Sequence, residues 1–521
     1  MKRLIVIALA LFTILSGEGV LSSLAQSPSA DYWPTDEWRT STPEAQGMDS
    51  AKLVEMLNWI KDQGYPIHNL TIIRNGHLVL EVNIHPSPPN ARHILYSTAK
   101  SVTSVLMGIA MQEGYLESVD QPVLDFFADR MVENVDERKQ AMTLEHLLTM
   151  MSGFDCSNVT TLEMEKTEDW IQFMLDRSMA MDPGQSFSYC NGCSQLLMAI
   201  VGQATGINPG DYARLKLFEP LGITDVVWPT TPQDIPVGFS EIQLTPRDLA
   251  KIGYLMLHDG EWDGTQIVSQ EWATTSRTHL VDAYTGLGLG YGYQWWTSPG
   301  LTHANFFSLG AHGQIMLVFP DLQLIVVYTS AFIDSDYDIP LMLSEMFATP
   351  AVVSDEPLPE NEEALTELTM LVDELANPEP QSVAIMPEFV KTIDGVTYTL
   401  DENELGWESV MLSFGESEAI LMVETAGQRI ELPVGLDGVY RMSSMTADSV
   451  FPLSFLGCIH PRNGTLALSG EVQGTAFQVN TQITGFVEHP VLRFVLWKGD
   501  LNVTILREID AASTRLHGTS Q

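Results

Sequence analysis

The sequence predicts an α/β (α+β) sandwich, an antiparallel sheet beside a helical lobe, followed by a second all-β antiparallel barrel. Helical and strand patterns alternate up to about residue 349, whereas short alternating strands broken by turns fill residues 391–509. A stretch rich in proline and glutamate, residues 350–390, lies between the two patterns. Because 521 residues exceed what one compact core usually holds, we expect separate domains.

The first 25 residues have the pattern of a secretory signal. Lys2 and Arg3 form a positive start, residues 4–15 an apolar core, and Ser23-Leu24-Ala25 a small-residue cleavage site. The apolar core is too short for a stable membrane span. We therefore expect a secreted or periplasmic protein without membrane insertion in its mature form.

The first domain, expected over residues 31–349, opens with a helix and a hairpin. The expected elements are a helix over 50–63 capped by Asp49 or Ser50, a hairpin of 70–73 and 78–84 turning at Asn75-Gly76, helices over about 97–257, and strands over 290–296 and 315–330 turning at Phe319-Pro320-Asp321. This order predicts a sheet whose strands come from both ends of the domain.

The segment 350–390 is expected to be a linker with a short amphipathic helix over 362–375, where leucine and valine recur at helical spacing. Such a helix has an apolar face that can dock on the first domain. The barrel that follows is expected to contain strands near 410–414, 420–424, 477–483, 492–497 and 501–506, with turns at Asp437-Gly438, Asn463-Gly464 and Lys498-Gly499-Asp500.

Ser97-Thr98-Ala99-Lys100 places a hydroxyl and an amine on one side of a helical turn, because residues three apart face each other. A serine hydroxyl is a weak nucleophile unless an adjacent base takes its proton, and a desolvated lysine can do so. The run 101–110 is almost uncharged, so this helix is expected to be buried and its lysine to need a partner or a function.

Two further motifs follow in order along the chain. Tyr189-Cys190-Asn191 precedes an apolar helix, and Gly310-Ala311-His312-Gly313-Gln314 precedes the last strands. Together with the serine–lysine motif they resemble the serine β-lactamase and penicillin-binding-protein superfamily, in particular its class C-like branch of esterases and D-peptidases. Thr143 to Gly153 and Leu244 to Ala250 resemble further landmarks of that family.

The resemblance implies a role for each motif. Ser97 would form an acyl-enzyme, and Lys100 would ease removal of its proton. Tyr189 would shuttle the proton to the leaving group, and Asn191 would hold Lys100 and the substrate. The backbone N–H groups of Ser97 and Gln314 would form the oxyanion hole, with His312 and Gly313 supporting the substrate. The resemblance also implies a lipocalin-like second domain.

The third motif departs from the family pattern, which is Lys-Thr-Gly in β-lactamases and binds the substrate carboxylate. If Gly313 aligns with the family glycine, Ala311 replaces the lysine; a shifted alignment puts His312 there instead. Either alignment favours a neutral ester or amide over a β-lactam. A structural role for His312 is equally consistent with its place at a strand edge.

Some relatives carry cysteines at positions that correspond to Cys156 and Cys190, so the resemblance implies a disulfide between them. Cys156–Cys193 is the second pairing to consider, and four free buried thiols are the alternative. A bridge to Cys190 would stiffen the loop that carries Tyr189.

Composition and missing motifs exclude other functions. A formal charge of −41 repels phosphates and argues against nucleic acid as a partner. The chain has no G-x-S-x-G, H-E-x-x-H or phosphate-binding loop motif, and its Cys190-x-x-Cys193 lacks a matching pair. We therefore expect no metal and no cofactor.

These observations predict an exported serine hydrolase that acts through an acyl-enzyme on a small-molecule ester or amide. The alternatives are a D-amino-acid peptidase, a peptidoglycan DD-carboxypeptidase or β-lactamase, and a non-catalytic binding protein that retains the fold. Retention of all four motif residues, Ser97, Lys100, Tyr189 and Asn191, argues against the last.

Overall fold

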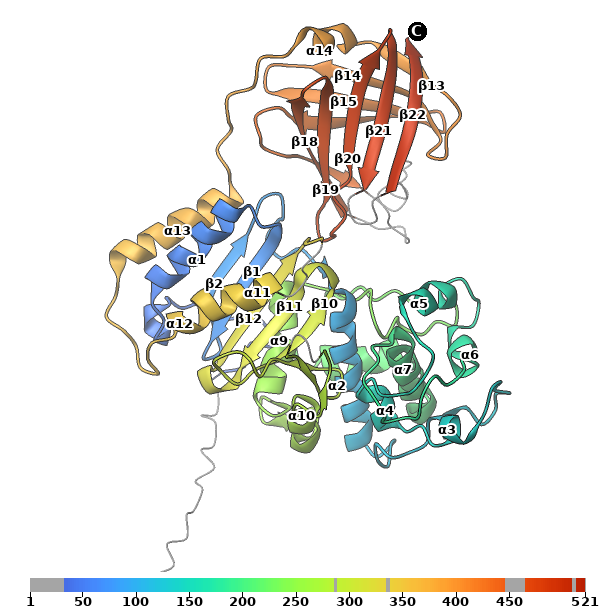
Figure 1. Cartoon of the computed structure of the whole chain (residues 1–521). Helices are drawn as coiled ribbons and strands as arrows, with labels where there is room; N and C mark the ends of the chain where they lie inside the picture. The colour runs from blue at the N-terminus through green and yellow to red at the C-terminus, as the bar shows by residue number, and fades with distance from the viewer. Residues whose placement is uncertain (1–31, 285–287, 334–337, 446–463, 508–511, 521) are drawn as a thin grey trace, which may run out of the picture. The chain divides into compact units, whose positions relative to one another are not determined.

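A computed structural model describes residues 32–520 apart from 285–287, 334–337, 446–463 and 508–511 (Figure 1). The expected signal segment lies outside the described residues, as does Asn463 of one expected barrel turn. Within the part that the structure describes, no helix is both long enough and apolar enough to cross a membrane.

The first domain is built on an antiparallel sheet of eight described strands. Their order is β2 (His77–Asn83), β1 (Ile67–Arg74), β12 (Leu324–Ser330), β11 (Gln314–Phe319), β10 (Phe306–Gly310), β9 (Trp296–Thr297), β8 (Gly290–Tyr291) and β7 (Val281–Asp282). The N-terminal hairpin β1–β2 therefore pairs with the last strand, β12, with Ile72 opposite Val326.

The central strands are covered on both faces, since every residue of β1, β11 and β12 is buried. Helix α9 (Pro246–Leu257) packs on all three of these strands. Its Gly253 allows this close approach, because a Cβ there would lie only 2.6 Å from the sulfur of Met316. The sheet is thus a rigid support for residues at its edge.

The helical lobe follows the hairpin in sequence (Figure 1). The described helices of the first domain are α1 (Ser50–Gln63), α2 (Ala99–Gln112), α3 (Glu137–Gln140), α4 (Leu144–Leu148), α5 (Asn158–Met164), α6 (Trp170–Leu175), α7 (Asn191–Thr205), α8 (Pro209–Ala213), α9, α10 (Gln270–Ser276), α11 (Asp338–Leu343) and α12 (Thr349–Ala351). Helix α2 is buried from Ala99 to Ala110 and packs against α7. The expected burial of the helix that carries Lys100 is confirmed.

The prediction of one continuous strand over 290–296 is wrong, because the chain turns between β8 and β9. Gln294 sits at the turn with φ of 64°. Its side-chain amide donates to the carbonyls of Leu147 and Leu148 and accepts from Ser194. These buried hydrogen bonds hold a left-handed conformation that a non-glycine residue rarely adopts.

The segment after the first domain contains the expected amphipathic helix, α13 (Glu362–Ala376), which packs against α1 and β2. Lys61 of α1 pairs with Glu374 at 2.5 Å, and the His85 N–H donates to the Leu375 carbonyl. This helix is therefore docked on the first domain. A short helix, α14 (Glu388–Ile393), leads into the second.

The second domain is a closed antiparallel barrel. Its described strands are β13 (Thr397–Leu400), β14 (Trp407–Phe414), β15 (Glu418–Thr425), β16 (Gln428–Gly435), β17 (Arg441–Met445), β18 (Gly464–Gln473), β19 (Ala476–Ile483), β20 (Val491–Trp497), β21 (Asp500–Arg507) and β22 (Ala512–Ser520). A parallel contact of Gly435 with Ser469 closes a ring of nine described strands, with β17 paired outside it. Buried side chains such as Trp407, Phe477 and Phe494 form its core. The predicted fold class is confirmed.

Candidate active site

The two residues of the serine–lysine motif touch. A short 3₁₀ turn, Tyr96–Thr98, precedes α2, so Ser97 lies just before the helix and Lys100 in its first turn. The Lys100 amine donates to Ser97 Oγ at 2.8 Å and to the Phe239 carbonyl at 3.0 Å. The contact that the three-residue spacing of Ser97 and Lys100 predicts is therefore present.

Lys100 is buried, with 1% of its surface exposed, and no acidic side chain among the described residues forms an ion pair with it. Burial lowers the pKa of its amine well below the ordinary lysine value, and only Cys193 opposes this shift. A lowered pKa leaves a larger share of the amine neutral at neutral pH, which is the form that can accept a proton.

Tyr189 lies on the other side of the lysine. The Lys100 amine stands 4.7 Å from the centre of the Tyr189 ring, and the Tyr189 hydroxyl hydrogen-bonds with Ser97. Burial raises the pKa of Tyr189, and the hydrogen bond with Ser97 opposes the rise. In the resting site the phenol is therefore protonated and able to give a proton away.

The third motif approaches the nucleophile from the sheet. Gly310 ends β10 so close to the Ser97 turn that a Cβ would lie 2.1 Å from the Leu95 carbonyl. Thr98 Oγ1 lies 3.5 Å from the carbonyl of Gln314, the first residue of β11. The Gln314 side chain donates to the Ser330 carbonyl at 2.7 Å, which fixes the start of this strand. The structure thus brings Gln314 beside the Ser97 turn.

His312 and Gly313 both have positive φ, 65° and 83°. The His312 ring hydrogen-bonds through Nδ1 to the Phe332 carbonyl at 2.7 Å and packs edge-on against Tyr96. The Gly313 carbonyl accepts from the Ser330 hydroxyl. The Nδ1 atom of His312 is therefore already hydrogen-bonded to a backbone carbonyl, and the Ala311 side chain has no charge with which to bind a substrate.

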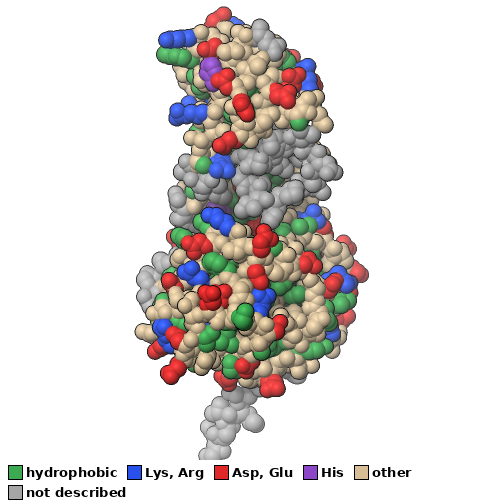
Figure 2. All heavy atoms as spheres, turned by 90° about the vertical axis from the view of Figure 1, so that its right-hand side faces the viewer, with side chains coloured by type: hydrophobic (Ala, Val, Ile, Leu, Met, Phe, Trp, Pro, Cys, Tyr) green, Lys and Arg blue, Asp and Glu red, His purple; other side chains and the backbone are tan. Residues whose placement is uncertain are grey.

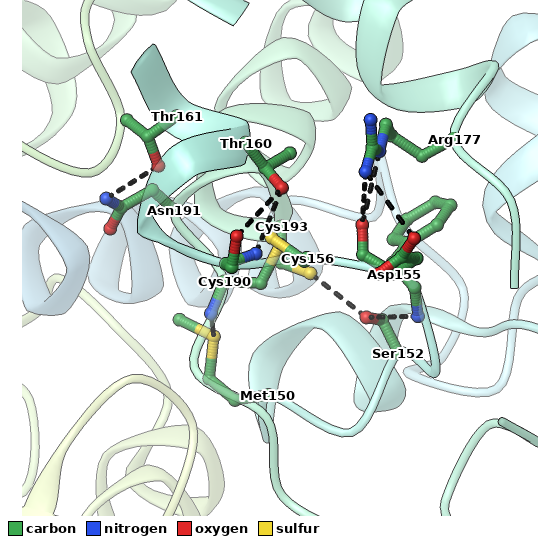
Figure 3. Close-up of a disulfide and its surroundings, with 12 residues drawn as sticks. Met150, Ser152, Asp155, Cys156, Thr160, Thr161, Arg177, Cys190, Asn191 and Cys193 are labelled. Carbon is green, nitrogen blue, oxygen red and sulfur yellow. Dashed lines mark hydrogen bonds and ion pairs between the residues drawn. A yellow bond between two sulfur atoms is a disulfide. The ribbon is translucent and has the colours of Figure 1, made fainter. Parts of the chain in front are cut away.

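Asn191 begins α7, where its amide donates to Thr161 Oγ1 at 3.1 Å (Figure 3). Its side-chain oxygen is buried without a hydrogen-bond partner among the described residues. Lys100 donates to Ser97 and Phe239, and the Asn191 amide donates to Thr161 in place of the expected contact with Lys100. The orphan oxygen remains available to a bound molecule.

Cys156 and Cys190 form a disulfide with Cα atoms 5.7 Å apart (Figure 3). This is the pairing that the resemblance implies, and the second choice, Cys156–Cys193, is wrong. Cys193 is free and buried, and its thiol donates to Ser152 Oγ at 3.2 Å. Burial raises the pKa of this thiol to about 12, so it stays protonated. The bridge ties the residue next to Tyr189 to the loop before α5.

Removal of this bridge is expected to weaken both the fold and the site. The bond closes a loop with a sequence separation of 34, so the Cys156→Ser, Cys190→Ser double variant should lose about 3 kcal/mol of unfolding free energy. Urea unfolding measures this loss, and kcat should fall with it because the Tyr189 loop is less restrained. Dithiothreitol should lower the unfolding free energy and the kcat of the wild type but not those of the double variant. An equal loss in the double variant would contradict the disulfide between Cys156 and Cys190.

Sequence reasoning did not find two parts of the site. The Phe239 carbonyl accepts from Lys100, but a backbone acceptor leaves no signature in a sequence. Of the rings packed on Tyr189, Phe187 comes from the same loop, but Trp296 comes from a distant segment of the chain. Trp295 is fully buried against Phe306, whereas its neighbour Trp296 stacks on Tyr189.

The described residues contain no group of three or more histidine, cysteine or acidic side chains that could hold a metal ion. On the face shown in Figure 2, acidic side chains are scattered over the surface with lysine and arginine between them.

Comparison with known proteins decides the family. The model of the family described as Beta-lactamase matches residues 45–335, which is more than half of the chain. The chain belongs to the beta-lactamase family. The match includes all three motifs, from Ser97 to Gln314, and ends before the barrel. The three motifs of this beta-lactamase-family chain therefore lie within the matched domain.

Named relatives of this beta-lactamase-family chain include hydrolases with different substrates. The 6-aminohexanoate-dimer hydrolase of Paenarthrobacter ureafaciens is 25% identical over 289 residues, 51% of this chain and 72% of that protein. A Salmonella heidelberg (strain SL476) protein with the provisional name D-alanyl-D-alanine carboxypeptidase is 24% identical over 40% of this chain and 54% of its own.

A solved structure from Bacillus anthracis, provisionally named as a 6-aminohexanoate-dimer hydrolase, is also similar. It has a TM-score of 0.50 and 18% identity, and the alignment covers 62% of this chain and 89% of that one. At this identity the likeness shows the fold alone.

Proposed function

We propose that this protein is an exported serine hydrolase that cleaves small esters or amides through an acyl-enzyme on Ser97. The observation that carries the proposal is the 2.8 Å contact between Ser97 Oγ and a buried Lys100 amine without an acidic partner among the described residues. A hydroxyl beside a base of lowered pKa is the arrangement that nucleophilic catalysis requires.

In the proposed reaction, neutral Lys100 accepts the Ser97 proton while Oγ attacks the substrate carbonyl. The N–H groups of Ser97 and Gln314 donate to the oxyanion that develops. Tyr189 gives its proton to the leaving group as the bond between the carbonyl carbon and that group breaks, and Lys100 returns a proton to Tyr189. Water then enters by the reverse path and releases the acid.

A D-amino-acid peptidase, including a DD-carboxypeptidase, is the second candidate. It is favoured by the provisional name of the Salmonella relative. Against it stands Ala311, which cannot bind a substrate carboxylate as a lysine would, together with the commitment of His312 Nδ1 to a backbone carbonyl. The non-catalytic binder remains the third candidate.

Acylation of Ser97 tests the proposal directly. The protein is mixed with p-nitrophenyl acetate, p-nitrophenyl butyrate, nitrocefin or a D-alanyl-D-alanine peptide, quenched in acid and analysed by intact mass and peptide mapping. We expect an acetyl or butyryl group on the peptide that contains Ser97. Turnover of the peptide or of nitrocefin would favour the second candidate, and the absence of any adduct and any turnover would favour the binder.

The pH dependence should report on Lys100. Its neutral form is the base, so kcat/KM for a neutral ester should rise with pH and then level off. Because burial lowers the pKa of Lys100, the plateau should be reached well below the ordinary lysine value. Initial rates from about pH 5 to pH 9 measure this. A rate that is flat or falls across that range would contradict Lys100 as the base.

A further inference from the structure

Four aromatic residues form a continuous wall beside Tyr189. The aromatic wall consists of Phe187, Tyr284, Tyr291 and Trp296. Trp296 stacks on Tyr189 with ring centres 5.8 Å apart, and Tyr284 stacks on Trp296 at 5.9 Å. Phe187 meets Tyr284, Tyr291 and Trp296 edge-on. The wall therefore begins at a proposed member of the reaction machinery and extends away from it.

The wall is buried at one end and open at the other. Trp296 and Tyr291 are buried, Phe187 is half-buried, and Tyr284 is 43% exposed. Exposed tyrosine faces next to a reacting centre present a large apolar area that keeps its shape, because a tyrosine has few rotatable bonds. The surface that the wall offers to a ligand beside Tyr189 therefore belongs to Tyr284 and Phe187, with Trp296 and Tyr291 supporting them from behind.

A second observation points to a ligand in the same place. The Tyr291 hydroxyl is completely buried and has no hydrogen-bond partner among the described residues. Burial raises the pKa of Tyr291 well above the ordinary tyrosine value, and the nearby Tyr189 and Tyr284 raise it further. Buried hydroxyls nearly always have a partner, so this hydroxyl is an unused donor in the wall.

The side of the substrate that meets the wall follows from the proposed role of Tyr189. A group that protonates the leaving group must lie beside it, whereas the acyl carbonyl faces the N–H groups of Ser97 and Gln314. We propose that the aromatic wall is the leaving-group subsite and that it selects an alcohol or amine bearing an aryl group. The proposal rests on the proposed acyl-enzyme function.

The same subsite acts in both half-reactions. In acylation the Ser97 Oγ–carbonyl bond forms, the bond to the leaving oxygen breaks, and Tyr189 supplies that oxygen with its proton. In deacylation an incoming alcohol reverses these steps. Tyr189 passes its proton to Lys100 and takes the proton of the alcohol, whose oxygen bonds to the acyl carbon. The bond from that carbon to Ser97 Oγ then breaks, Lys100 returns the proton to Ser97, and a new ester is released. An aryl alcohol held by the wall should therefore compete with water and with smaller alcohols for the acyl group.

Partition of one acyl-enzyme between two alcohols isolates this subsite. Vinyl acetate supplies the acetyl group with a small leaving group, and ethanol and benzyl alcohol are added at equal concentration. The ratio of benzyl acetate to ethyl acetate, measured by gas chromatography, does not depend on the acylation rate. Wild type should favour benzyl acetate, and Tyr284→Ala should lower the ratio roughly three- to tenfold.

Tyr115→Ala is the matched control, because Tyr115 is also 43% exposed but lies beyond the end of α2, remote from Ser97. It should leave the product ratio unchanged.

Tyr291→Phe tests the orphan hydroxyl with the three isomers of hydroxybenzyl alcohol. Wild type should prefer at least one isomer to benzyl alcohol, and the variant should lose that preference.

The two proposals fail in different ways. If wild type is acetylated on Ser97 but neither Tyr284→Ala nor Phe187→Leu changes the product ratio twofold, the leaving-group assignment is wrong and the hydrolase proposal stands. If Ser97 is not acetylated, the hydrolase proposal fails. The wall is then tested alone by the binding of benzyl acetate to the Ser97→Ala protein, measured by tryptophan fluorescence. If adding Tyr284→Ala to that protein leaves the Kd unchanged, the assignment of the wall as the leaving-group subsite is wrong.

Discussion

Replacement of Ser97 by alanine is expected to lower kcat for p-nitrophenyl acetate by about four to six orders of magnitude. The substitution removes only the oxygen that the Lys100 amine contacts at 2.8 Å. Steady-state hydrolysis, corrected for the uncatalysed rate, measures the loss. The acetyl adduct on the Ser97 peptide should disappear from the mass spectrum at the same time.

The Ser97→Ala protein should unfold at a temperature close to that of wild type, because Ser97 is only half-buried and loses a single atom. This control separates loss of the nucleophile from loss of the fold. Ester hydrolysis that survives in a folded Ser97→Ala protein would identify a different nucleophile and overturn the proposed reaction.

The Lys100→Met variant should lose activity and change the pH dependence of stability. Without the base, kcat should fall by about two to four orders of magnitude. Burial holds the Lys100 pKa below its value in the unfolded chain, so the unfolded state binds more protons. Between the lowered pKa and the unfolded pKa, the wild-type free energy of unfolding should therefore rise with pH. This contribution should be absent from the methionine variant.

Thermal unfolding of both proteins from neutral pH to about pH 10 tests the predicted pH dependence of stability. The Tm of the variant relative to wild type should be highest at neutral pH and fall as pH rises. Lys139→Met is a matched control: Lys139 is a buried lysine that donates to the Glu133 and Leu175 carbonyls, away from Ser97. It should keep ester hydrolysis. A constant Tm difference between Lys100→Met and wild type would contradict the lowered pKa.

The parts of the site that the sequence predicted are those that depend on local geometry. Ser97 and Lys100 are three residues apart at a helix start, so one turn suffices to bring them together. Helix α1 begins at Ser50 and ends at Gln63 as expected, because Asp49 caps it and Gly64 takes the left-handed conformation after it. The barrel strands followed from their alternating pattern, which is also local.

The parts that the sequence could not predict depend on distant segments. The Phe239 carbonyl reaches Lys100 across 139 positions of the chain, and any residue type carries such a carbonyl. The split of the strand at Gln294 depends on the carbonyls of the last two residues of α4, Leu147 and Leu148. The family resemblance suggested a contact from Asn191 to Lys100, whereas the nearby Thr161 hydroxyl takes the Asn191 amide.

The order of strands in the first domain has a consequence for folding during synthesis. Strand β1 pairs with β12, so its partner leaves the ribosome about 250 residues later, and Gln314 is made long after Ser97. The serine–lysine contact can form early within one helix turn, but the sheet edge that completes the site cannot. A nascent chain that ends before residue 324 would pair the apolar β1 with β2 alone and leave its other edge, the one that pairs with β12, without a partner. Such unpaired strand edges favour aggregation. High contact order should therefore make completion of the sheet the slow step of folding for this domain.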